Sequence, residues 1–334
     1  MAASVGAHAA ALAPTDRNTR DRPHVMTVRG SIDARRLGFT LSHEHALVNF
    51  QPYEEWARQP HKYDREEVVE VVLPYLTRVR ALGCRSFVDP TPPFLGRDAE
   101  VLRRLSEKSN LHILTATGNY AAREHRHLPP HVFTDSPAAL AQRWIEEWEK
   151  GIEGTGVKPG LMKLGFNGAR LTDVERRLID AAAIAHRKTG LTIAAHTGPA
   201  VSAFEQLERL ESAGVHPSAW IWIHAQQEQD LGNHITAARR GAWISFDGVS
   251  PESTGAHVDR VIRLRDAGLL KQVLVSQDAG WYNVGDPRGG KIRPFDTVFT
   301  TFIPSLRARG FSTADIDTLF VDNPARAFAV AVRS

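Results

Sequence analysis

Cysteine is almost absent from this sequence of 334 residues, in which Cys84 is the only one. A single cysteine excludes an intrachain disulfide and any zinc finger built on cysteine ligands. Long apolar runs are missing too, since none approaches the roughly 18 residues of a membrane span. The alanine-rich N-terminus has no Lys or Arg before Arg17, which is the wrong order for a secretory signal. We therefore expect a cytoplasmic protein with no membrane partner.

The net charge of the chain is also small. The 41 Lys and Arg residues face 38 Asp and Glu residues, which gives a net charge of +3 at pH 7. Residues 1–36 hold six arginines and three aspartates and so contain the whole excess. The rest of the chain is neutral, which argues against the basic surface of a nucleic-acid-binding protein. We expect a disordered N-terminal tail over residues 1–24 and a single domain over residues 25–334.

What the sequence does contain is a regular alternation of strands and helices. Eight short apolar runs end near His43, Asp89, Ala116, Lys163, His196, His224, Phe246 and Asp278. Each interval has room for a loop and a helix, and Thr172 with Glu175 forms a capping box for a helix that ends before Gly190. Eight such units favour a closed (β/α)8 TIM barrel over an open sheet. An open dinucleotide-binding sheet would place a glycine-rich turn after its first strand, where this chain has Ser42–His45.

Five of the predicted strands carry a metal-binding type of side chain at or near their carboxyl ends, and the first of them carries two. In a TIM barrel these ends meet at one mouth, where the catalytic residues lie. The candidates are His43, His45, Lys163, His196, His224 and Asp278. The two histidines of a His-x-His strand point to the same face and can bind one metal ion. A single strand-end histidine is more often a core residue, but the coincidence of the whole set predicts a metal centre.

Lys163 is unusual because it lies in the apolar stretch Gly160–Gly165. A buried amine tends to lose its charge, and a neutral amine can capture CO2 as a carbamate that ligates through two oxygens. The alternative is a lysine whose head group reaches solvent at the strand end. Six ligands, one of which bridges, suit a site with two divalent ions. Zinc is the leading candidate, and manganese, iron and cobalt are the alternatives. Such a pair generates a bridging hydroxide at neutral pH, and Asp278 could take its proton.

These motifs resemble the phosphotriesterase-like branch of the amidohydrolase superfamily over roughly residues 26–330. The resemblance rests on Val28–Gly30, Gly38–His45, Gly96–Asp98, Ala116–Gly118, Lys163, Ala195–Thr197, Val275–Asp278 and Asn323–Arg326. It implies a (β/α)8 barrel with a binuclear metal centre and a homodimeric assembly. By this resemblance, His43, His45 and Asp278 bind the more buried metal, His196 and His224 bind the more exposed one, and the Lys163 carbamate bridges them. Family members hydrolyse lactones, organophosphate triesters, or related esters and amides.

The expected substrate pocket departs from the family in part. The position after Asp247, often a histidine or arginine that serves a proton relay, is Gly248 here. At the position of Tyr120, the lactonases of this family resemble one another in having tyrosine, whereas the triesterases have tryptophan. Trp281 and Tyr282 are expected to form pocket walls, and Gly289–Gly290 suggests a mobile lid. Near that lid, three cations could receive an anionic substrate or could simply be solvated: Arg288, Lys291 and Arg293.

Together these features predict a metal-dependent hydrolase that acts on ester bonds of a small molecule. Lactones or other carboxylic esters are the leading substrates, and phosphotriesters could be a side reaction. The close alternatives are an organophosphate phosphotriesterase proper and an N-acyl amide hydrolase. The alternative from another class is a non-catalytic metal-binding barrel retained as a sensor or scaffold, which Gly248 mildly favours and the intact ligand set argues against.

Overall fold

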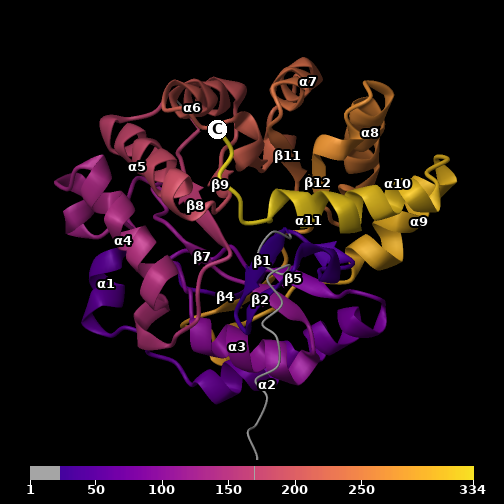
Figure 1. Ribbon diagram of the computed structural model, residues 1–334. Coiled ribbons are helices and arrows are strands. Elements are labelled where there is room, and N and C mark those ends of the chain that lie inside the picture. Colours follow the sequence, from indigo (N-terminus) through magenta and orange to yellow (C-terminus); the bar gives the residue numbers. More distant parts are fainter. Residues whose placement is uncertain (1–22, 169) are drawn as a thin grey trace, which may run out of the picture.

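The structure is a computed structural model that describes residues 23–168 and 170–334. The expected N-terminal tail therefore lies almost entirely outside the described residues, and the first strand begins at His24. Strands and helices alternate through the rest of the chain, with the helices arranged around a central sheet (Figure 1). None of the described helices is both long and apolar enough to cross a bilayer.

The strands are short and mostly buried. Their bounds are β1 His24–Thr27, β2 Gly30–Asp33, β3 Thr40–Leu41, β4 His45–Val48, β5 Ser86–Val88, β6 His112–Leu114, β7 Ala116–Thr117, β8 Leu161–Gly165, β9 Ile193–His196, β10 Trp220–Ile223, β11 Trp243–Phe246, β12 Val273–Val275 and β13 Gly280–Asn283.

The helices cover the outside of these strands. Their bounds are α1 Tyr53–Arg58, α2 Arg65–Ala81, α3 Ala99–Ser109, α4 Pro137–Lys150, α5 Asp173–Thr189, α6 Ala200–Ser212, α7 Leu231–Arg239, α8 Thr254–Asp266, α9 Ile303–Ala308, α10 Thr313–Asp317 and α11 Asn323–Ala327.

The strands close into a parallel barrel, as the sequence predicts. Strands β7 to β12 pair in chain order, and β3, β5 and β6 pair beside them. β6 and β7 are separated only by Thr115, so they form one interrupted barrel strand. The remaining seam is closed where the Asp278 amide donates to the His43 carbonyl at 3.1 Å. The (β/α)8 TIM barrel is thereby confirmed.

Local sequence signals explain how the helices begin and end. The Thr172 hydroxyl and the Glu175 carboxylate form the expected capping box at the start of α5, and Gly190 ends the helix in a left-handed conformation. Asp98 caps α3 through the amides of Glu100 and Val101. Apolar residues of the helices then pack on the barrel in one continuous core.

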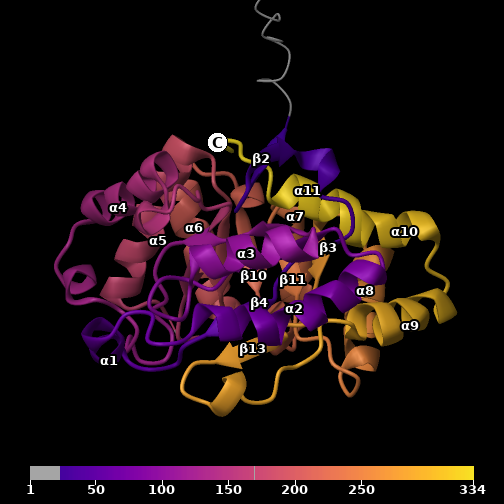
Figure 2. The same ribbon diagram turned by 90° about the horizontal axis from the view of Figure 1, so that it is seen from below.

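The two ends of the barrel differ. The antiparallel hairpin of β1 and β2, which the sequence analysis did not predict, lies at one end, and β13 with its following loop lies at the other (Figure 2). The carboxyl ends of the barrel strands open at the β13 end, since β13 continues from the segment that follows β12 and pairs with β4. Lys163 lies in the middle of β8 rather than at its end, because the strand runs two residues further, to Gly165.

Candidate metal centre

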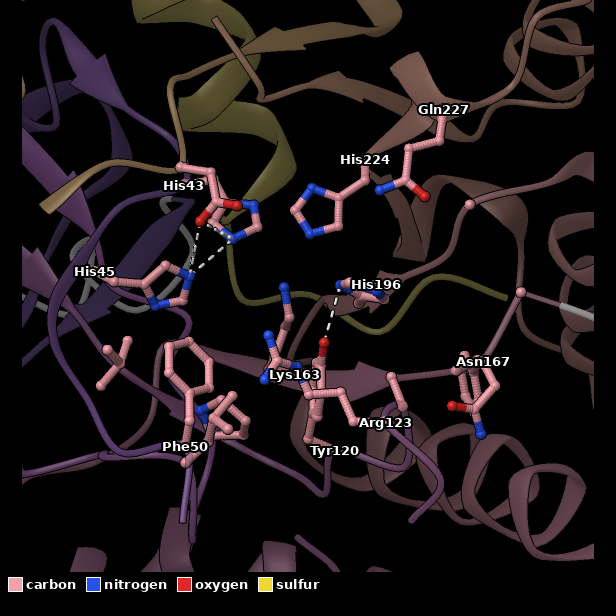
Figure 3. Close-up of a pocket in the computed structure, with 18 of the residues that line it drawn as sticks. His43, His45, Phe50, Tyr120, Arg123, Lys163, Asn167, His196, His224 and Gln227 are labelled. Atoms are coloured by element: carbon pink, nitrogen blue, oxygen red, sulfur yellow. Dashed lines mark hydrogen bonds and ion pairs between the residues drawn. The ribbon is translucent and has the colours of Figure 1, made fainter. Parts of the chain in front are cut away.

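A single cavity at the mouth of the barrel gathers all six predicted ligands. It has a volume of about 260 Å³, and Tyr120 and Trp281 also line it. Histidines reach it from several strands, with Lys163 and Tyr120 beside them (Figure 3). Phe50, Arg123 and Asn167 line the side of the cavity opposite His43 and His224, and Gln227 lies beside His224. The predicted convergence of separate strand ends on one site is therefore present.

His43, His45 and Asp278 form the tightest group in the cavity. The two Nε2 atoms lie 3.2 Å apart, and Asp278 Oδ1 lies 3.2 Å from His45 Nε2 and 3.8 Å from His43 Nε2. Asp278 Oδ1 is buried and accepts no hydrogen bond from any described residue. Three donor atoms within 4.8 Å of one another can bind one metal ion.

The hydrogen bonds on the far side of the two imidazoles fix their tautomers. His43 Nδ1 lies 3.0 Å from the Asp247 carboxylate, which can only accept, so the ring proton is on Nδ1. His45 Nδ1 lies 2.7 Å from the Thr91 hydroxyl, which can donate its own proton to the Leu47 carbonyl at 3.4 Å and so accept from Nδ1. Both Nε2 atoms therefore present lone pairs to each other and to Asp278. Such a group of acceptors is stable only around a cation, so the donor set fits a metal ion.

His196, His224 and Lys163 complete the donor set on the other side of the cavity. The His196 and His224 rings lie 4.5 Å apart between centroids, and the Tyr120 hydroxyl lies 3.2 Å from His196 Nδ1. Lys163 is 2% exposed, and burial lowers the pKa of its amine to about 8, although three buried carboxylates oppose the shift. The described residues offer its ammonium no hydrogen bond or ion pair. A buried lysine of this kind suits conversion to an anionic carbamate ligand.

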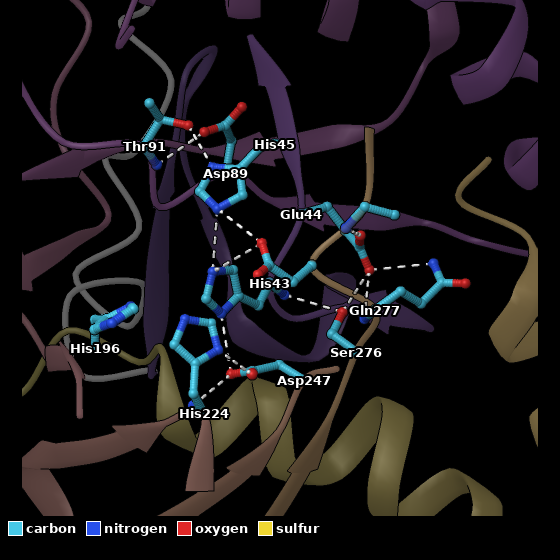
Figure 4. Close-up of polar contacts among 12 residues, drawn as sticks. His43, Glu44, His45, Asp89, Thr91, His196, His224, Asp247, Ser276 and Gln277 are labelled. Atoms are coloured by element: carbon cyan, nitrogen blue, oxygen red, sulfur yellow. Dashed lines mark hydrogen bonds and ion pairs between the residues drawn. The ribbon is translucent and has the colours of Figure 1, made fainter. Parts of the chain in front are cut away.

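Asp247 supports the site from behind. Its carboxylate accepts from Nδ1 of His43 at 3.0 Å and from Nδ1 of His224 at 2.7 Å (Figure 4). Asp247, His43 and His224 also lie close enough together to bind a metal. We interpret this trio as a support and not a second metal site, because the carboxylate uses both oxygens on ring N–H groups. Sequence reasoning missed this role, although Asp247 directly follows a buried strand like the predicted ligands do.

Glu44, between the two strand-one histidines, holds the segment around Asp278. Its buried carboxylate accepts from the Ser276 hydroxyl at 2.7 Å, from the Gln277 amide at 3.0 Å and from the Ala279 amide at 2.7 Å. The last two donors flank Asp278, whose φ of 49° lies in the left-handed region. Burial raises the pKa of Glu44 to about 7, and these hydrogen bonds oppose the shift. Glu44 therefore positions Asp278 without reaching the cavity (Figure 4).

One expectation about the pocket is corrected. Tyr282 does not line the cavity, because it follows Trp281 on β13 and points the other way, where its hydroxyl donates to Glu67. The segment around Gly289 is packed directly against Tyr282, and its role as a mobile lid stays a prediction.

The three loop cations, which could receive an anionic substrate or could simply be solvated, lie outside the cavity lining. Arg288 pairs with Glu70, and Arg293 donates to the carbonyls of Asp278 and Gln277. Lys291 is absent from the described lining of the cavity too.

The place of the missing relay residue is taken by an amide. A Cβ on Gly248 would meet Gln226 Nε2 at 2.7 Å, so the glutamine side chain fills the space that a larger residue would need. Gln226 Nε2 donates to Asp247 Oδ1 at 3.1 Å, and its Oε1 accepts from the Asp247 amide at 3.2 Å. An amide holds Asp247 in place but cannot carry a proton at neutral pH.

Comparisons with known proteins agree with this geometry. The model of the phosphotriesterase family matches residues 23–328. The chain is similar to the phosphotriesterase homology protein of Escherichia coli, with 30% identity over 87% of this chain and 98% of that protein. It is also similar to an aryldialkylphosphatase of Saccharolobus solfataricus, with 26% identity over 90% and 98% of the two chains. A lactonase of Listeria monocytogenes has a similar structure, with a TM-score of 0.78 and 25% identity over 92% and 99% of the two chains.

Proposed function

Since the chain belongs to the phosphotriesterase family of metal-dependent hydrolases, we propose that it hydrolyses lactones or other small carboxylic esters at a binuclear metal centre. The observation that carries the proposal is the convergence of the His43 and His45 Nε2 atoms on an Asp278 oxygen that accepts no hydrogen bond from the described residues. His196, His224 and the buried Lys163 offer ligands for a second ion in the same cavity. Zinc suits these ligands best, and manganese, iron or cobalt would also fit.

When bound, two divalent ions would supply an activated water at neutral pH and a Lewis acid for the substrate carbonyl. The residues of the chain would then position the substrate and move protons. Asp278 has a carboxylate oxygen directed into the cavity and is the only carboxylate among the described lining residues, so it would accept the proton from the attacking water. It would return this proton to the leaving oxygen, since it is the only carboxyl group in the described lining.

Features of the pocket favour a small ester or lactone over a bulky triester. The cavity of about 260 Å³ lies below the roughly 300–1,000 Å³ common for drug-sized ligands. Tyr120 places a hydroxyl beside His196, at a point where it can donate to the ring oxygen of a lactone. Likeness to a lactonase also supports this choice, whereas likeness to an aryldialkylphosphatase keeps phosphotriesters as the second candidate.

A combined metal and substrate experiment tests the proposal. The protein is stripped with a chelator, reconstituted with zinc or manganese in bicarbonate, and analysed for metal content and for hydrolysis of γ-lactones, aryl esters, N-acyl amides and paraoxon-like triesters. We expect about two ions per chain and metal-dependent turnover that is fastest on lactones or esters. A stoichiometry near zero would refute the metal centre. Two bound ions without turnover of any substrate would instead support a non-catalytic barrel.

A further inference from the structure

The wall of the cavity carries one cation that the ligand set does not use. Among the described lining residues, Arg123 is the only charged side chain that is not a candidate metal ligand. Its guanidinium lies 4.4 Å from the centroid of the Phe50 ring. It makes no hydrogen bond or ion pair with any residue that the structure describes, although arginine carries five N–H donors. Arg123 therefore has its full donor capacity free at the entrance to the site (Figure 3).

The backbone that presents Arg123 is strained and firmly held. Arg123, Glu124 and His125 have φ angles of 60°, 58° and 63°, so three successive residues other than glycine adopt the left-handed conformation. Such residues cost free energy, and they persist where the surrounding structure fixes them, often at functional sites. Asn167 fixes this turn, since its Oδ1 accepts from the Glu124 amide at 3.1 Å and its Nδ2 donates to the Ala121 carbonyl at 3.3 Å.

The same turn is tied to the segment that carries Phe50. The Arg126 guanidinium donates to the Phe50 carbonyl at 3.0 Å, and His127 Nδ1 lies 3.1 Å from the Gln51 carbonyl. The segment that carries the Phe50 ring, which lies under the Arg123 guanidinium, is thus joined to the turn that carries Arg123. This geometry places the exposed Arg123 side chain over one wall of the cavity.

The charge around Arg123 is not neutralised. Asp278 is the only carboxylate in the described lining, and its oxygen is directed toward the histidines. A neutral ester gains little from an unpaired guanidinium, whereas an anion gains charge-assisted hydrogen bonds. We propose that the substrate carries an anionic group, a carboxylate, phosphate or sulfonate, that Arg123 binds while the ester or lactone carbonyl lies at the metal centre. The small cavity limits the anion to a few bonds from that carbonyl.

This inference rests on the proposed ester hydrolysis, so the test compares substrates that differ only in charge. One pair is mono-4-nitrophenyl glutarate and 4-nitrophenyl valerate, and the other is 5-oxotetrahydrofuran-2-carboxylate and γ-valerolactone. We expect the native enzyme to prefer the anionic member of each pair. Arg123→Gln should lower kcat/KM for the anionic members about 10- to 100-fold, the usual effect of losing hydrogen bonds to a charged group. It should leave the neutral members within about twofold.

Two controls separate recognition from a general loss of charge. Arg187→Gln makes the same charge change at an exposed position of α5 outside the cavity lining, and it should alter neither substrate pair. Arg123→Lys should recover part of the loss, because an ammonium keeps the charge but not the planar set of donors.

A binding measurement gives a readout that does not depend on turnover. Calorimetry should show that pyroglutamate, an anionic lactam, binds the native protein more tightly than Arg123→Gln, while neutral 2-pyrrolidinone does not distinguish them. Hydrolysis of both members of a pair at equal rates, unchanged in Arg123→Gln, would overturn the role of Arg123 and leave the proposed function intact. Failure to hydrolyse either member of both pairs would refute the proposed ester hydrolysis, and with it this inference.

Discussion

Replacing Asp247 with asparagine should stop one of the histidines bonded to it from binding a metal ion, although that histidine itself is not mutated. The Asp247 carboxylate accepts from Nδ1 of both His43 and His224. Asparagine keeps the shape but offers an oxygen on one side and an N–H donor on the other. The imidazole that meets the new donor must move its proton to Nε2, the nitrogen that faces the cavity. That histidine can then no longer donate a lone pair to a metal ion.

The other contacts of Asp247 show which histidine should be lost. Oδ2 accepts from His43 Nδ1 at 3.0 Å, from the His224 amide at 3.2 Å and from the Ser245 hydroxyl at 2.8 Å. Among the described residues, Oδ1 accepts only from His224 Nδ1 and from Gln226 Nε2, and turning the Gln226 amide would offer an acceptor there at the cost of its bond from the Asp247 amide. The asparagine oxygen should therefore take the Oδ2 side, and its amide should face His224. His43 keeps its tautomer, and His224 changes.

The expected result is selective loss of one of the two ions. Losing an outer hydrogen-bond partner typically weakens metal binding about 10- to 100-fold, and the loss of a ligand lone pair places Asp247→Asn at the upper end of that range or beyond. Metal analysis after dialysis should give about one ion per chain, and kcat should fall by at least about 100-fold. Long-range proton–nitrogen NMR of the metal-free protein should show a changed tautomer at His224 alone.

The matched control is Ser245→Ala. It removes one donor to the same carboxylate without presenting a donor to either imidazole, so both ions should stay bound. If Asp247→Asn binds two ions as tightly as the native protein and keeps kcat within about twofold, the tautomers are set by something other than Asp247.

Three further predictions address the other parts of the site and its support. Lys163→Ala should lose one ion and most activity, and short carboxylic acids added with metal should partly restore turnover. Full activity in Lys163→Arg would show that this residue is no ligand. Asp278→Asn should retain much of its metal but lose about 10²- to 10⁴-fold in kcat, most of all for esters with poor leaving groups. If Asp278→Asn binds two ions and hydrolyses such an ester at the wild-type rate, another group accepts the proton. Arg97 is buried and paired with Glu147 and Glu153, so Arg97→Met should lower the free energy of unfolding by about 3–5 kcal/mol in denaturant titrations while the metal content of the folded protein is unchanged.

The convergence of the candidate ligands could be predicted from the sequence because it follows from strand periodicity and strand order, although the left-handed backbones of His224 and Asp278 could not. Alternate residues of a strand share a face, so His43 and His45 had to point together, and buried parallel strands had to bring His196 and His224 to the same end of the barrel. No backbone detail was needed for this step. The exact end of β8 was not needed either, because Lys163 points into the barrel from the middle of the strand.

The rest of the pocket depends on loop conformations that the sequence pattern does not encode. Tyr282 was placed in the wall beside Trp281, but the two lie on one strand and neighbouring residues of a strand face opposite ways. Arg123 was overlooked because its turn has three left-handed residues and no glycine to signal them. The amide beside Gly248 comes from Gln226, on a different loop, so only the assembled fold shows it.

Two of the proposed metal ligands are held in a conformation that their own backbones disfavour. His224 has a φ of 61° and Asp278 has a φ of 49°, and each such residue costs about 1–3 kcal/mol. In both cases a buried carboxylate accepts from the adjacent backbone: Asp247 from the His224 amide, and Glu44 from the amides on either side of Asp278. The same two carboxylates are tied to the segment between β3 and β4, since Glu44 lies in it and Asp247 bonds to His43. This segment therefore supports the backbones of proposed ligands that follow two other strands.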